Sequence, residues 1–277
     1  MELERVLVVG AGQMGSGIAQ VVAASGRRVA LHDPYPGATD RALESMRRSL
    51  AKLAEKGGPD PDETLARIEV VDRLAPADLM IEAVVEDAAV KEELFRRADA
   101  ELPADAILAS NTSSIPIGSL AAVTARPERV IGMHFFNPVP VLALVEVIRA
   151  PETSAETARA ILELARSLGK EPVEVRDVAG FVSNRILMPF LNEAVYALAE
   201  GVADAEGIDT VARLGFAHPL GPLALADLIG LDTCVAIMEV LERGLGDARY
   251  APAPLLREYV AAGRLGRKSG RGFHEYG

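Results

Sequence analysis

A glycine-rich turn near the N-terminus constrains the fold of this 277-residue chain more than any other feature. Residues 5–9 form a short apolar run rich in β-branched side chains, and a helical apolar pattern begins at Ile18. Between them lies the sequence Gly10-Ala11-Gly12-Gln13-Met14-Gly15. Glycines at this spacing allow a tight turn, the approach of a pyrophosphate to the backbone and close packing of the helix. The pattern therefore predicts a dinucleotide-binding βαβ unit.

The residues after the turn support this interpretation. Residues 28–32 form the next expected strand, and Asp33 follows it, 18 residues after Gly15. A carboxylate at that place can accept hydrogen bonds from the adenosine ribose hydroxyls and would repel a 2′-phosphate. We therefore expect NAD rather than NADP as the cofactor.

The rest of the chain alternates and then changes character. Strands are expected at 68–71, 79–84, 107–109, 130–133, 142–147 and 172–175, and helices at 37–56, 90–102 and 154–168. Beyond residue 180 only helices are expected, at 181–200, 205–214, 222–244 and 254–262. The sequence therefore predicts an α/β Rossmann-type dinucleotide-binding domain over residues 1–179, followed by an all-α C-terminal domain over residues 180–277.

The helical domain carries a possible dimer surface. Leu187, Leu191, Val195 and Leu198 recur at helical spacing and would leave apolar surface exposed on a domain of this size. A second copy of the chain could cover such a surface. We therefore expect a homodimer built through the C-terminal domain.

Composition excludes several classes of function. A formal net charge of −11 argues against binding to nucleic acid or to an anionic membrane. Cys234 is the only cysteine, so an internal disulfide is impossible, and one thiol with four histidines makes a metal site unexpected. The N-terminus lacks a secretory pattern, and no apolar run reaches the ~20 residues of a membrane-spanning helix. We expect a cytoplasmic protein without a metal ion.

Residues 130–147, VIGMHFFNPVPVLALVEV, combine two apolar runs with a turn-rich centre. His134 stands at the end of the first run, and Glu146 interrupts the second. A carboxylate is costly to bury without a partner, and His134 is the nearest candidate. A carboxylate that orients an imidazole is an arrangement used for general-base catalysis. On these residues alone, a core histidine beside a strand-edge glutamate is the more common arrangement.

Other polar segments allow two interpretations each. The helix over 37–56 carries Arg47, Arg48, Lys52 and Lys56, which indicates either a phosphate-rich ligand or a solvated face. The run 110–114, SNTSS, follows a strand and consists of either turn formers or ligand contacts. Asn184 either begins a helix or reaches a ligand. The basic loop 266–272 either forms a flexible tail or serves a function.

Several stretches together resemble those of one enzyme family. They are GAGQMGSGIAQ, IEAVVED, SNTSS, HFFNPVPVLALVEV, DVAGFVSNR, GFAHPLGPLALADLIGLD and GRKSGRGF. Through them, and over essentially all 277 residues, the chain resembles the L-3-hydroxyacyl-CoA dehydrogenases, in particular their short stand-alone bacterial members. The resemblance implies an oxidoreductase of fatty acid metabolism that interconverts (S)-3-hydroxyacyl-CoA, with a short acyl chain, and 3-oxoacyl-CoA by hydride transfer with NAD(H).

The resemblance also implies roles for individual residues. His134 would be the general base and Glu146 its partner, while Ser113 and Asn184 would contact the substrate. Coenzyme A would touch two positions on or after the basic helix, Ser49 and Lys56. The implied cofactor contacts, besides the glycine turn, are Asp33, Glu86, Lys91, Ser113, Asn137 and Lys268.

Two departures from the family pattern concern the substrate. Ala143 replaces a basic residue, and Ser183 replaces an apolar one. These departures do not concern the chemistry.

Two rival functions stay open independently of them. A related fold serves hydroxy-acid dehydrogenases that act on free acids, and some relatives are idle NAD-binding or structural proteins.

Overall fold

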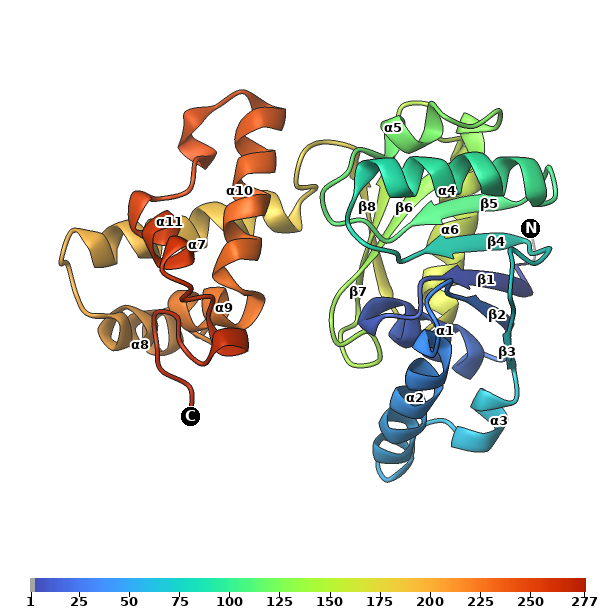
Figure 1. Ribbon diagram of the computed structural model, residues 1–277, viewed down its shortest axis with the longest axis horizontal. Helices are drawn as coiled ribbons and strands as arrows, with labels where there is room; N and C mark the ends of the chain where they lie inside the picture. Colours follow the sequence, from blue (N-terminus) through green and yellow to red (C-terminus); the bar gives the residue numbers. More distant parts are fainter. Residues whose placement is uncertain (1–2) are drawn as a thin grey trace. The chain divides into compact units, whose positions relative to one another are not determined.

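The computed structural model describes residues 3–277 of the chain (Figure 1). Its internal contacts divide the chain into two compact units, the first ending at Asp177 and the second spanning Val178–Gly277. Within the described part of the chain, no helix combines the length and the apolar character needed to cross a membrane.

The first unit is built on one sheet with the strand order β3-β2-β1-β4-β5-β6-β7-β8. Its strands are β1 (Arg5–Val9), β2 (Arg28–His32), β3 (Ile68–Val70), β4 (Leu79–Glu82), β5 (Ile107–Ser110), β6 (Val130–Phe135), β7 (Leu144–Arg149) and β8 (Glu171–Arg176). Neighbours from β3 to β6 are parallel, whereas β7 is antiparallel to β6. After β3 the chain returns to the other side of β1. The carboxyl ends of β1 and β4 therefore flank the switch point where such sheets bind ligands.

Helices cover both faces of this sheet (Figure 1). Helices α1 (Gln13–Ala24), α2 (Ala38–Ala54) and α6 (Ala155–Ser167) share one apolar core with Met133 and other strand residues. The opposite face carries α4 (Ala88–Glu101) and α5 (Ile117–Ala121), whose Ile117 lies against Gly132. Successive strand residues point to opposite faces, so His134 lies on the face of Gly132. The remaining helical segments are α3 (Pro61–Leu65) and η1 (Pro127–Arg129).

Some expected boundaries were wrong. Strand β4 ends at Glu82 rather than at residue 84, and β7 begins at Leu144 rather than at residue 142. His134 lies inside β6, because antiparallel pairing with β7 extends that strand to Phe135. Short helix α5 was not expected.

The second unit contains α7 (Ser183–Ala199), α8 (Ala205–Gly215), α9 (Pro222–Ile229), α10 (Leu231–Leu245), η2 (Ala248–Tyr250), α11 (Pro254–Ala261) and η3 (Arg267–Ser269). The prediction of a single helix over 222–244 was wrong, because this range contains two helices. Gly230 has φ +103° and ψ 125°, a conformation that a helix cannot contain, and it separates α9 from α10.

The apolar stripe of α7 is less exposed than expected. Leu191 and Val195 are buried in the core of the second unit, and Leu187 and Leu198 pack against that core. Helices of the same unit therefore cover most of this stripe, whereas Leu187 and Leu198 stay partly exposed. The exposed apolar side chains include Val211, Leu214 and Phe216, at and after the end of α8.

The basic loop 266–272 leads into a C-terminal segment that is anchored by side chains of the same unit. Buried Asp227 accepts hydrogen bonds from the backbone of Phe273 and His274 and from the Tyr276 hydroxyl, at 2.9, 2.9 and 3.0 Å. The neighbouring carboxylate of Asp209 contacts His274 Nε2 at 2.7 Å. Two buried acids thus anchor the C-terminal segment.

Candidate active site

The glycine turn has the geometry that a bound pyrophosphate requires. Gly10 has φ +100°, and a Cβ there would lie 2.4 Å from the carbonyl oxygen of Ala83. A Cβ on Gly15 would lie 1.7 Å from the Gly10 carbonyl oxygen, so only glycine permits this packing. By contrast, a Cβ on Gly12 would meet nothing within 4 Å. The backbone is thus open at Gly12, next to the N-terminus of α1, where phosphates are favoured.

Asp33 follows β2 at the same edge of the sheet. Its Oδ2 accepts a hydrogen bond from the Ala11 N–H at 2.7 Å, and its Oδ1 accepts one from the Tyr35 N–H at 2.9 Å. A carboxylate has about four acceptor sites, so each oxygen retains capacity for a ribose hydroxyl. The turn and this acid together fit NAD.

A cavity of about 350 Å³ adjoins the turn. Its lining includes Gly12, Gln13, Arg41, Ser45, Ser49 and Asn137. The structure thus brings together residues that were predicted to contact the cofactor (Gln13 and Asn137) and coenzyme A (Ser49). Met14 is half-buried and packs against the core, while Lys56 lies beyond the end of α2 and outside this lining.

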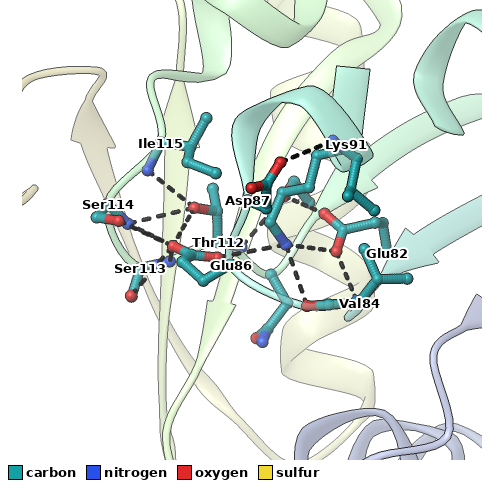
Figure 2. Close-up of polar contacts among 12 residues, drawn as sticks. Glu82, Val84, Glu86, Asp87, Lys91, Thr112, Ser113, Ser114 and Ile115 are labelled. Atoms are coloured by element: carbon teal, nitrogen blue, oxygen red, sulfur yellow. Dashed lines mark hydrogen bonds and ion pairs between the residues drawn. The ribbon is translucent and has the colours of Figure 1, made fainter. Parts of the chain in front are cut away.

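Glu86 connects the end of β4 to loop 110–114 (Figure 2). Its Oε1 accepts hydrogen bonds from Thr112 Oγ1 at 2.6 Å, from Ser113 N at 2.9 Å and from both N and Oγ of Ser114 at 3.0 Å. Burial opposes ionisation, but the Lys91 ammonium and these hydrogen bonds outweigh it and hold the pKa of Glu86 below its usual 4.5. Glu86 therefore stays ionised and fixes the loop that carries Ser113.

Lys91 is almost completely buried, with 1% of its side chain exposed. Its ammonium lies between Glu82 Oε1, at 2.5 Å, and Glu86 Oε2, at 3.3 Å. Glu82 lay within the strand expected over 79–84 and was not predicted as a site residue. Its complete burial and its contact with Lys91 of α4 join residues that no local pattern connects.

His134 and Glu146 lie directly opposite each other in the β6–β7 pair. The imidazole Nδ1 is 3.0 Å from Glu146 Oε2, and the two residues are 8% and 2% exposed. Because the ionised carboxylate can only accept, Nδ1 donates its proton, and Nε2 becomes the basic nitrogen. The partner proposed for Glu146 from the sequence is therefore its partner in the structure.

Two supporting residues were missed in the sequence. Asn111 accepts a hydrogen bond from the Phe135 N–H at 2.9 Å, and it thereby ties loop 110–114 to β6 beside His134. The buried Lys170 ammonium donates to the carbonyl oxygens of Val139 and Leu142, in the β6–β7 loop. Burial lowers the pKa of Lys170. An amide at a strand end was a weak signal for Asn111, whereas nothing local pointed to Lys170.

Two predicted site residues belong to the second unit. Asn184 is buried in the first turn of α7, with 8% exposed. Lys268 forms an ion pair with Asp232 at 2.6 Å. Burial opposes ionisation of Asp232, but the Lys268 hydrogen bond and charge, with backbone N–H groups, lower its pKa. The contacts of Asn184 with the substrate and of Lys268 with the cofactor stay predictions.

The open glycine turn, the acid after β2 and the histidine–carboxylate pair define the class of the first unit, a dinucleotide-binding domain of an oxidoreductase. The model of the NAD-binding domain of 3-hydroxyacyl-CoA dehydrogenase matches residues 5–178, and that of its C-terminal domain matches residues 180–276. The chain belongs to the 3-hydroxyacyl-CoA dehydrogenase family.

Individual relatives resemble the chain along its whole length. A probable 3-hydroxybutyryl-CoA dehydrogenase of Bacillus subtilis is 54% identical over 282 aligned residues, covering 100% of this chain and 98% of the relative. The 3-hydroxybutyryl-CoA dehydrogenase of Bradyrhizobium diazoefficiens is 48% identical over 280, covering 99% and 96%. The crystal structure of (S)-3-hydroxybutyryl-CoA dehydrogenase from Ralstonia eutropha superposes with a TM-score of 0.97 at 47% identity, covering 100% of both chains.

Proposed function

We propose that this protein interconverts (S)-3-hydroxyacyl-CoA and 3-oxoacyl-CoA with NAD(H), and that its substrate has a short acyl chain, as in 3-hydroxybutyryl-CoA. The observation that carries this proposal is the His134–Glu146 pair, buried on the same sheet as the dinucleotide turn. The printed names of the relatives support the thioester substrate and the short chain.

In the proposed mechanism, His134 moves the proton. Its Nε2 accepts the proton of the substrate 3-hydroxyl as C3 loses a hydride, and it returns the proton when the reaction runs backward. Glu146, 3.0 Å from Nδ1, stabilises the imidazolium that forms. When bound, NAD⁺ supplies the hydride acceptor. In this mechanism His134 transfers the proton, and Glu146 stabilises the resulting charge.

Other residues would hold the substrate and the cofactor. We propose that Ser113 and Asn184 bind the hydroxyl and the thioester carbonyl, and thereby decide which C3 hydrogen is transferred. Coenzyme A would lie along α2 at Ser49, which lines the cavity beside Asn137, and would reach Lys56. The cofactor contacts would be the glycine turn with Asp33, Glu86, Lys91, Asn137 and Lys268.

Oxidation of NADH by acetoacetyl-CoA tests this function. We expect turnover with the thioester and little or none with free acetoacetate, because the free acid lacks the coenzyme A contacts along α2. Equal turnover of both compounds would favour a hydroxy-acid dehydrogenase instead. A protein that binds NADH but reduces neither compound would be an idle relative.

We also infer a cytoplasmic homodimer. NAD(H) and acyl-CoA thioesters are intracellular metabolites, which supports that location. Val211, Leu214 and Phe216 are all more than half exposed on the helical unit and offer apolar surface for a second copy. Light scattering tests the oligomeric state, and a monomer at micromolar concentration would refute the dimer.

A further inference from the structure

Glu82 is a carboxylate with no exposed surface, at the last position of β4. Burial of a charge is costly unless partners compensate it, so the partners of this residue indicate what it does. Glu82 Oε1 accepts hydrogen bonds from Val84 N at 2.7 Å and from the Lys91 ammonium, and Oε2 accepts one from Ser110 Oγ at 2.6 Å. One side chain thus joins the end of β4, helix α4 and the end of β5.

The Lys91 ammonium is shared between two acids (Figure 2). It lies 2.5 Å from Glu82 and 3.3 Å from Glu86, and its remaining polar neighbour is the Val84 carbonyl oxygen at 3.5 Å. Glu82 makes the shorter contact, so it holds the ammonium in place, and its own negative charge offsets part of the attraction between Lys91 and Glu86. Without Glu82, the attraction of Lys91 for Glu86 would be unopposed, and the ammonium would lose its closest partner.

Glu82 reaches the loop of Ser113 by two routes. Through Lys91 it sets the position of Glu86, whose Oε1 accepts the hydrogen bond of Ser113 N at 2.9 Å. Through Ser110, whose Oγ accepts a hydrogen bond from Thr112 N at 3.1 Å, it holds the start of the same loop. The contacts of Glu82 itself, with Lys91 and with Ser110, are buried and involve a charged group, and such contacts are strong.

We propose that Glu82 is a positioning residue, which holds Glu86 and loop 110–114 in the arrangement that presents Ser113 to the substrate. The role of Ser113 in this statement rests on the proposed function. Glu82 itself touches neither substrate nor cofactor. It acts by holding the Lys91 ammonium beside Glu86 and by fixing Ser110.

A double-mutant cycle tests the proposal. Glu82→Gln keeps the size of the side chain but removes its charge, and we expect kcat with acetoacetyl-CoA to fall about tenfold. If the effect passes through Ser113, the same change in a Ser113→Ala background should lower kcat by less than about twofold. A tenfold loss in both backgrounds, or full activity of folded Glu82→Gln, would overturn the proposal.

Asp99→Asn is the matched control. Asp99 lies on the same helix as Lys91 and forms a shielded ion pair with Arg126 at 2.7 Å. It should change stability but not kcat. If Glu82→Gln does not fold, Ser110→Ala takes its place in the cycle, because this variant removes one contact of Glu82. We expect Ser110→Ala to lower kcat about threefold in the wild-type background and to have no further effect in the Ser113→Ala background. Equal losses in both backgrounds would again refute the idea.

Measurements of NADH binding test the role of Glu82 without relying on catalytic activity. Glu82→Gln should weaken NADH binding, measured by calorimetry, about fivefold, and should not weaken it further in a Glu86→Gln background. This outcome would support the network even if wild-type protein failed to reduce acetoacetyl-CoA. Unchanged NADH affinity, or equal weakening in both backgrounds, would count against the network.

Discussion

At the scale of single residues, the site depends on carboxylates that are held by specific partners. Glu146 faces one imidazole across a strand pair, whereas Glu86 receives several hydrogen bonds from one loop. In the first arrangement, the carboxylate stabilises the imidazolium that forms when the imidazole takes up a proton. The second holds a loop in one conformation. We therefore propose different roles for the two acids, charge stabilisation for Glu146 and loop positioning for Glu86.

The His134–Glu146 pair predicts a specific kinetic pattern. His134→Ala should lower kcat by roughly 10²–10⁴-fold, the usual contribution of a positioned proton-transfer group, with little change in NADH affinity. Glu146→Gln keeps shape and hydrogen bonding but removes charge, so it should lower kcat by a smaller factor. In the double variant Glu146→Gln should add almost nothing, because no imidazolium remains to be stabilised. Losses that multiply in steady-state assays would contradict the pair.

Glu86 predicts a dependence of stability on pH. Its pKa in the folded protein lies below its usual 4.5, so the unfolded chain binds more protons as pH falls below that value. The stabilisation is complete above about pH 4.5 and is lost as pH falls through the folded-state pKa.

Urea unfolding of the wild type and of Glu86→Gln tests this dependence. From about pH 6 to about pH 3, the free energy of unfolding of the wild type should fall more steeply. Other acids, such as Asp78, titrate equally in both proteins. Parallel curves would show that Glu86 contributes no such stabilisation.

At the scale of elements, the loop between β6 and β7 needs support from distant parts of the chain. It lines the cavity through Asn137 and Pro138, and a Cβ on Gly17 of α1 would lie 2.8 Å from the Val139 side chain. Lys170, which follows α6, donates to two carbonyl groups of the loop. Helix α1 and the segment between α6 and β8 therefore support the wall of the cavity.

Lys170→Met tests this support. Methionine keeps most of the apolar stem but leaves two loop carbonyls without their donor, at a cost of about 1 kcal/mol each. We expect the KM for acetoacetyl-CoA to rise about fivefold or more, while kcat changes less. Lys170→Arg, which keeps charged donors, should restore most of the affinity. An unchanged KM in the methionine variant would show that the loop holds its conformation unaided.

At the scale of the whole molecule, the features that could be predicted from sequence are those with a local cause. The glycine turn and the strand and helix periodicities depend on neighbouring residues, and His134 and Glu146 meet because their strands are consecutive. Contacts between distant residues could not be predicted, such as Glu82 with Ser110 and Lys170 with Val139.

Helix α7 illustrates the same limit in the second unit. Its periodicity showed which face is apolar but not what covers that face. In the structure, core residues from α9, α10 and α11 pack with Leu191 and Val195. A sequence pattern thus predicts that a face will be buried, but the fold decides whether the same chain or a second copy buries it.

The last prediction uses Cys234 to report on the second unit. This thiol has no exposed surface, and burial, with the nearby Asp232 and Asp227 carboxylates, raises its pKa to about 12. Because the thiolate is the reactive species, the folded protein at about pH 8 should react with an aromatic disulfide reagent at less than about 1% of the rate of the unfolded chain. Labelling should follow opening of this unit as urea is added. Ala203→Cys, which adds a thiol at an exposed position of the same unit, should give one equivalent of immediate reaction. Fast, stoichiometric labelling of the folded wild type would contradict the burial of Cys234 in the helical core.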